Sequence, residues 1–171
     1  MSKLEIVKVP DPILRETSAP VDSVDADVRR LMDDMLETMY DAPGVGLAAI
    51  QVGVPRRVIV LDVATDEEEP QPLLMANPEI VQLGETLRTH EEGCLSIPGV
   101  NVEIERPAEV TVRYVDRDGA ARELAADGLL ATAIQHEVDH LDGKLIIDFL
   151  SRLKRDMIIR RLKKQQRPAS V

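Results

Sequence analysis

Two histidines four residues apart, with a glutamate beside the first, are the part of the sequence that most clearly predicts chemistry. The segment runs His136-Glu137-Val138-Asp139-His140. On an α-helix this spacing places both imidazoles on one face, one turn apart, where they can share a metal ion. A chance pair on a structural helix is the alternative, but two of the three His residues stand at this spacing. The segment therefore predicts two ligands of a metal centre.

A catalytic metal needs a third protein ligand and an open position. No Glu follows Glu137, so a later glutamate ligand is excluded. Gly143 matches the glycine of the metzincin pattern, but Ile146 stands where that pattern needs its last His. Upstream, Cys94 is the only thiol of the chain, and a thiolate is a strong ligand for a borderline-soft metal. A lone cysteine is more often a small buried apolar residue, so Cys94 needs support from its surroundings.

That support comes from three blocks of sequence. They are Gly-Val-Gly-Leu-Ala-Ala-Ile-Gln (44–51), Glu-Gly-Cys-Leu-Ser (92–96) and Gln-His-Glu-Val-Asp-His-Leu-Asp-Gly (135–143). Together, in their order and separation, they resemble the peptide deformylase family, and the match extends over nearly the whole chain. The resemblance implies a metal-dependent hydrolase of protein biosynthesis. Its reaction would be N-terminal methionine processing, in which the formyl group leaves the formyl-methionine of newly made polypeptides as formate.

The resemblance also implies roles for individual residues. The metal ligands of the family correspond here to Cys94, His136 and His140. Ferrous iron is the metal expected, while zinc, nickel or cobalt can occupy such a site. Glu137 would be the general base that takes a proton from water and later hands it to the departing amine. The side-chain amide of Gln51 and the backbone N–H of Leu95 would stabilise the negative oxygen of the intermediate.

Further residues are expected to bind the substrate or support the site. The backbone of Gly44-Val45-Gly46 has little bulk, so an extended peptide could lie along it as an added strand. The methionine pocket is expected to be walled by Val45, Leu129 and Ala133. Asn101 is smaller than the residue expected at the rim of this pocket, which puts the preference beyond methionine in doubt. Glu92 and Arg106 either pair behind the cysteine or lie separately on the surface.

The elements that must position these residues follow from hydrophobic periodicity and turn residues. Helices are predicted at 28–40, 128–141 and 149–166, strands at 57–63, 73–76, 79–83, 109–115 and 120–125, and an irregular Gly-rich segment at 44–53. Asp118-Gly119 predicts a hairpin between the last two strands. On the last helix, one side is expected to carry Leu150, Leu153, Met157, Ile158 and Leu162. The predicted fold is α+β, with antiparallel sheets around the central helix that carries both His residues, and with an N-terminal and a C-terminal helix.

Length and charge restrict the organisation and the partners. The 171 residues predict a single domain, 1–171, ending in a basic helix and tail. Residues 151–171 carry eight basic residues and one acidic, a net charge of +7, whereas the preceding residues carry −17 of the total of −10. The basic tail resembles the extension that some bacterial deformylases use to bind the ribosome; an ordinary solvated helix is the alternative.

Composition excludes several classes of function. Only 2% of the residues are aromatic, so base-stacking surfaces and direct sequence-specific nucleic-acid binding are not expected. No leader peptide and no stretch of about 18 apolar residues is recognisable, and one cysteine cannot form an internal disulfide. A cytoplasmic protein without membrane association is therefore predicted. Two other functions stay open: a His-Glu-x-x-His metallopeptidase, and a catalytically silent deformylase-like module that binds peptides.

Overall fold

The computed structural model describes residues 2–166 and has the predicted α+β architecture. One sheet has the strand order β1-β2-β3-β6-β7, with every neighbouring pair antiparallel. Its strands are β1 (Gly46–Ala48), β2 (Val58–Leu61), β3 (Leu73–Leu83), β6 (Glu109–Val115) and β7 (Ala121–Asp127). A second sheet is the antiparallel hairpin of β4 (Leu87–Cys94) and β5 (Ile97–Pro107). The helices are α1 (Ala26–Asp41), α2 (Gly128–Leu141) and α3 (Arg152–Gln165).

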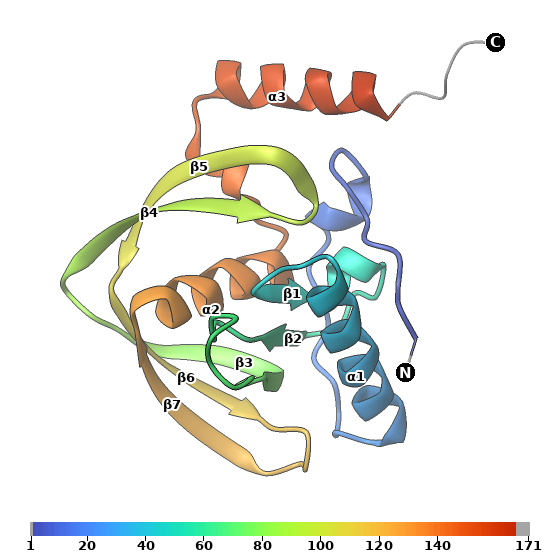
Figure 1. Cartoon of the computed structure of the whole chain (residues 1–171), viewed down its shortest axis with the longest axis vertical. Coiled ribbons are helices and arrows are strands. Elements are labelled where there is room, and N and C mark those ends of the chain that lie inside the picture. The colour runs from blue at the N-terminus through green and yellow to red at the C-terminus, as the bar shows by residue number, and fades with distance from the viewer. Residues whose placement is uncertain (1, 167–171) are drawn as a thin grey trace.

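Helix α2 lies between the two sheets (Figure 1). Its bounds are those predicted, and it contacts strands of both sheets. Ala131, Ile134 and Leu141 are fully buried and pack with apolar side chains of the five-stranded sheet. Small residues in the middle of the helix let the strands approach closely. A helix enclosed in this way holds its side chains rigidly, which suits a site built on one of its faces.

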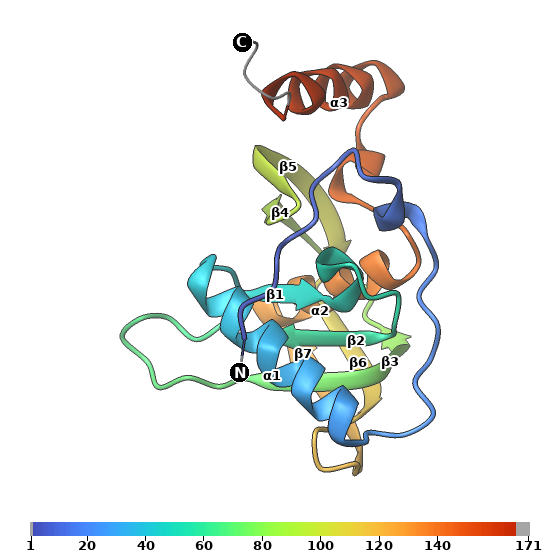
Figure 2. The same cartoon turned by 90° about the vertical axis from the view of Figure 1, so that its right-hand side faces the viewer.

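Helix α1 and the N-terminal segment complete the side of the molecule next to β1. The Asp25 side chain caps α1 by accepting a hydrogen bond from the Val28 N–H at 2.9 Å. Three fully buried methionines of α1 pack against β1 and β2. The N-terminal segment runs from the side of β1 toward β5 (Figure 2). It is held there by backbone hydrogen bonds from Val7 to Gln51 and from Val9 to Ser96.

Several strand predictions need correction. The Gly-rich segment 44–53 is not irregular throughout, because it contains β1 and a 3-10 turn at Ala49–Val52. The two short strands predicted around Asn77-Pro78 are one strand, β3, with irregular register against β6 at that point. The β4–β5 hairpin was not predicted at all. Regular strand structure therefore surrounds Cys94, where the sequence indicated only a motif.

The last helix also differs from its prediction. It begins at Arg152 because Ile146–Phe149 forms a separate 3-10 turn, and the Ser151 side chain accepts from the Lys154 N–H. The expected apolar side is confirmed for Leu150, Ile158 and Leu162, which pack against the core. It is wrong for Leu153 and Met157, which are 72% and 61% exposed. At 3.6 residues per turn, Leu153 lies opposite Leu162 rather than beside it. Among residues 2–166, no helix is long and apolar enough to cross a membrane.

The turn after α2 generates a stability prediction. Gly143 has a φ of +76°, and a Cβ there would lie 2.5 Å from the backbone oxygen of Arg15. We expect Gly143→Ala to lower the free energy of unfolding by roughly 2–4 kcal/mol, because backbone strain and a backbone clash add. Gly119→Ala is the control, since Gly119 has a φ of +84° with open space around it. It should cost only about 1–2 kcal/mol in urea unfolding. Equal losses would contradict the close contact at Arg15.

Candidate active site

A cavity of about 840 Å³ opens between α2, the β4–β5 hairpin, the start of β1 and the N-terminal segment. It brings together nearly all of the residues predicted to form the site. Those that line it are Val45, Gly46, Gln51, Cys94, Leu95, Leu129, Ala133, His136 and Glu137. His140 does not line the cavity; it lies one helical turn beyond His136 and is 1% exposed.

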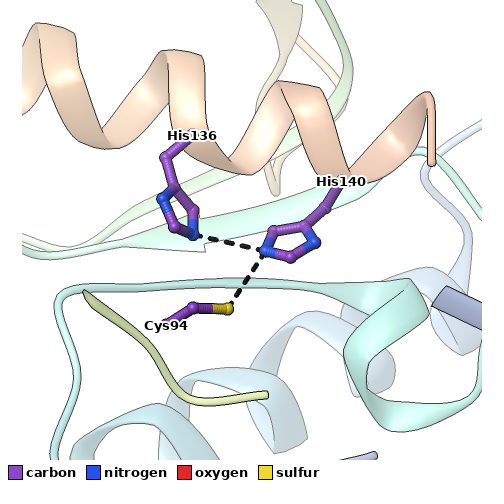
Figure 3. Close-up of side chains that lie close together, drawn as sticks. All are labelled: Cys94, His136 and His140. Atoms are coloured by element: carbon purple, nitrogen blue, oxygen red, sulfur yellow. Dashed lines mark hydrogen bonds between the residues drawn. The ribbon is translucent and has the colours of Figure 1, made fainter. Parts of the chain in front are cut away.

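The side chains of Cys94, His136 and His140 point toward one another (Figure 3). The Nε2 atoms of His136 and His140 are 3.2 Å apart, and the Cys94 Sγ lies 3.4 Å from the His140 Nε2. All three ligand atoms lie within 4.8 Å of one another. Ligands of one tetrahedral metal ion at normal bond lengths are about 3.3–3.6 Å apart. The group therefore has the donor types and the spacing to hold one metal ion.

The hydrogen bonding of His136 supports the same conclusion. Its Nδ1 lies 2.9 Å from Glu92 Oε1, so Nδ1 donates to the carboxylate and the other ring nitrogen, Nε2, faces His140. Burial opposes protonation, but Glu137, Cys94 and Glu92 outweigh it and raise the pKa of His136 well above its ordinary value. Burial, His136 and Arg106 hold the pKa of His140 well below its ordinary value. The neighbours of His136 thus favour positive charge at the cluster.

Behind the cluster, Arg106 joins the hairpin to α2. Its Nε and Nη2 donate to both carboxylate oxygens of Glu92 at 2.7 and 3.0 Å, and its Nη1 donates to Asp139 at 2.8 Å. Arg106 and Glu92 are both buried, so the structure favours their pairing over the alternative of two separate surface residues. Burial opposes the charge on Glu92, but the hydrogen bonds from His136 and Arg106 lower its pKa below the ordinary value. Asp139 was not predicted as a member of this network.

Glu137 lies beside the cluster in a different environment. Its Oε2 is 4.0 Å from the His136 Nε2, and its Oε1 is buried without a hydrogen-bond partner in the described chain. Burial raises the pKa of Glu137 to about 7, although His136 acts in the opposite direction. A buried carboxylate with one free oxygen, facing a cavity beside three potential ligands, is suited to proton transfer.

The amide of Gln51 is held in a defined orientation. Its Oε1 accepts from the Ala48 N–H at 2.9 Å, and its Nε2 donates to the Ser96 hydroxyl at 3.0 Å and lies 3.6 Å from the Cys94 Sγ. The donor end of the amide therefore faces the cluster. Ser96 is fully buried and was not recognised from the sequence. Its position in the Glu-Gly-Cys-Leu-Ser block was the only available signal.

The lining of the cavity includes polar residues that were not predicted. Val45 and Leu129 are 45% and 36% exposed at its rim, whereas Ala133 is 5% exposed in its wall. His90 and Thr132 also line the cavity and were not predicted there. Strand alternation could have placed His90 on the same face of β4 as Glu92 and Cys94.

Comparison with known proteins agrees with the geometry. The family model for polypeptide deformylase matches residues 3–156. Peptide deformylase of Rhizobium meliloti is 60% identical over 159 residues, which cover 93% of this chain and 91% of the relative. That of Agrobacterium fabrum is 58% identical over 162 residues, 95% of each chain. The crystal structure of the Ehrlichia chaffeensis enzyme in complex with actinonin superposes with a TM-score of 0.94 at 42% identity, covering 98% of this chain and 100% of that one.

The resemblance indicated by the three sequence blocks is therefore confirmed over most of the chain. The architecture that positions the site is also shared with solved deformylase structures. Neither the peptidase nor the silent-module alternative is favoured by these matches. The chain belongs to the polypeptide deformylase family, metal-dependent hydrolases that remove the N-formyl group from newly synthesised polypeptides.

Proposed function

We propose that this chain, as one domain spanning residues 1–171, deformylates nascent formyl-methionyl peptides in the cytoplasm with a single metal centre. Cys94, His136 and His140 are the proposed ligands, and ferrous iron is the proposed metal. The observation that carries the proposal is the convergence of these three ligand atoms within 4.8 Å, beside a buried carboxylate. When bound, a metal ion at such a site supplies Lewis acidity and lowers the pKa of water from 15.7 to about 7. Zinc, nickel or cobalt could fill the same donor set.

Glu137 is the proposed general base and general acid. Its carboxylate faces the cavity 4.0 Å from the His136 Nε2, within reach of a water placed at the cluster. It would take a proton from the attacking water and deliver that proton to the nitrogen of the departing amine. The other carboxylate near the cluster, Glu92, is occupied by Arg106 and His136. Glu137 is therefore the better placed of the two for proton transfer.

Gln51 and Leu95 are the proposed donors to the oxygen of the formyl group. The bonds from Ala48 and to Ser96 orient the Gln51 amide before substrate arrives, so little reorganisation is needed during the reaction. Leu95 follows Cys94 directly and lines the cavity, which supports its backbone N–H as the second donor. Neutral donors suit an oxygen that becomes negative only in the intermediate.

The substrate peptide is proposed to bind along β1. This strand is at the edge of its sheet, and Val45 and Gly46 line the cavity, so an extended peptide can add to it as a strand. Val45, Leu129 and Ala133 would surround the methionine side chain. Asn101 also lines the cavity, and its Oδ1 would be 2.9 Å from a Cβ built on Gly93.

Formate release from formyl-Met-Ala-Ser tests the function directly. The protein is expressed anaerobically with iron, and bound metal is quantified in the same preparation. Deformylation without casein cleavage is expected. Casein cleavage would favour a general metallopeptidase, and a fully metallated protein that binds the peptide but releases no formate would favour a silent peptide-binding module.

We predict that Glu137→Ala lowers kcat by roughly 10²–10⁴-fold while the bound metal is retained, because proton transfer is lost but the three proposed ligands are not. Formate release and metal content measure the two effects separately. Full turnover in the metallated variant would contradict the proposed role of Glu137.

A second prediction concerns Glu92. We expect Glu92→Gln to weaken metal affinity by roughly 10–100-fold, because the amide cannot both accept from Arg106 and hold the His136 proton as the carboxylate does. Competition with a chelator measures the affinity. Glu91→Gln is the matched control, since the neighbouring carboxylate is exposed and should have no effect. Equal affinities for both variants and the parent would exclude the supporting role of Glu92.

The proposed ribosome contact is supported by the charge of the C-terminal segment and by the exposed apolar side of α3. Residues 167–171, including Arg167, lie outside the described part of the chain. Leu162 is buried against the body, so deleting the whole helix would also disturb the core. Substitution of exposed basic side chains is a cleaner test than truncation.

We predict that replacing Arg160, Arg161, Lys163 and Lys164 with Gln lowers co-sedimentation with ribosomes severalfold, with a difference that shrinks as salt rises. Turnover of formyl-Met-Ala-Ser should be unchanged. In the control, Arg113 and Arg122 are replaced with Gln. Both arginines are exposed, on β6 and near the start of β7. Equal pelleting of the quadruple variant, the control and the parent would contradict the proposed ribosome contact.

A further inference from the structure

Gly46 lies so close to Glu137 that a residue with a side chain would not fit at position 46. A Cβ built on Gly46 would lie 2.5 Å from Glu137 Oε2 and 3.0 Å from both Cδ and Cγ of the same side chain. Distances below 3.0 Å are essentially absent between real Cβ atoms and their neighbours, so one of the two residues would have to shift. Because two carbons of Glu137 are involved as well as the terminal oxygen, rotating the carboxylate alone does not remove the contact.

The backbone conformation gives no separate reason for a glycine here. The glycines with positive φ are Gly53, Gly99, Gly119, Gly128 and Gly143. Gly46 is not among them, and it pairs in register with Leu61 of β2. An L-residue could adopt this strand conformation without strain. The space taken by Glu137 is thus the feature that requires a residue without a side chain.

Neither backbone can easily move to accept a Cβ. Leu47 and Ala48, which follow Gly46, are fully buried between α1, β2 and α2, and the α2 residues Ile134 and His140 are buried as well. The part that can move is the Glu137 side chain. No hydrogen bond from the described chain holds its Oε1, so packing rather than bonding sets the position of the carboxylate.

We propose that Gly46 is a positioning residue for Glu137: the missing side chain at Gly46 leaves the space that keeps the Glu137 carboxylate beside the His136–His140–Cys94 cluster. This inference rests on the proposed role of Glu137 as the base. It assigns the missing side chain of Gly46 to the position of Glu137, rather than to room for the substrate, which is the function expected from the sequence. The two functions affect different measured quantities.

The test is a double-mutant cycle of the parent, Gly46→Ala, Glu137→Ala and the double variant, each loaded with metal. Gly46→Ala should lower kcat for formyl-Met-Ala-Ser at least tenfold, with KM changed less than threefold and metal content unchanged. Its melting temperature should fall by about 3 °C or more in the parent background, but by much less in Glu137→Ala, where the clashing side chain is gone. A parent-background variant that fails to fold while the double variant folds would support the same coupling.

Binding of the uncleaved peptide shows whether the missing side chain of Gly46 positions Glu137 or makes room for the substrate. In the Glu137→Ala background, adding Gly46→Ala should leave the Kd of formyl-Met-Ala-Ser within twofold. A tenfold weaker Kd in that background, or equal loss of melting temperature in both backgrounds, would overturn the proposal. Gly84→Ala, far from the site and with a Cβ that would lie 3.2 Å from Glu109, controls for a general effect of added bulk. Full turnover of Glu137→Ala would instead contradict the proposed function itself.

Discussion

The buried ion pair between Arg106 and Glu92 is the interaction on which the rest of the site depends. It lies on the β4–β5 hairpin and reaches α2 twice, through Asp139 and through the Nδ1 of His136. Buried charges are costly unless fully paired, so this network fixes where the hairpin sits against the helix. Cys94 belongs to the hairpin and both histidines belong to the helix. Their convergence therefore follows from the same pairing that satisfies the buried charges.

The fold was most predictable where its signals are local. Helix α2 and the β6–β7 hairpin follow from apolar periodicity and from a turn of known type, and both agree with the prediction. The β4–β5 hairpin was missed because the inward face of β4 carries polar residues such as Glu92, which hide the alternation expected of a strand. Its partner β5 does alternate, with Val100, Val102 and Ile104 buried, and this was the signal available. The apolar face of α3 was predicted incorrectly at Leu153 because helical geometry was misapplied, not because the sequence lacked a signal.

The candidate site was predictable as a set of residues but not as an arrangement. Family motifs indicated the proposed ligands, Glu137 and Gln51, because the proposed chemistry requires these residue types. The contacts that hold them were less accessible: Ser96 under Gln51, Asp139 beside Arg106 and the close packing of Gly46 are tertiary contacts without a periodic signal. Within residues 2–166, the Glu137 Oε1 is buried without a hydrogen-bond partner, and this feature of the site also has no signal in the sequence.

One thiolate and two imidazoles are proposed to hold the metal ion. X-ray absorption spectroscopy of the zinc-loaded protein tests it most directly, because sulfur and nitrogen neighbours differ in distance and scattering. The account predicts one sulfur at about 2.3 Å and two imidazole nitrogens at about 2.0 Å, with one further light atom. A spectrum without sulfur, or with a single imidazole, would contradict it.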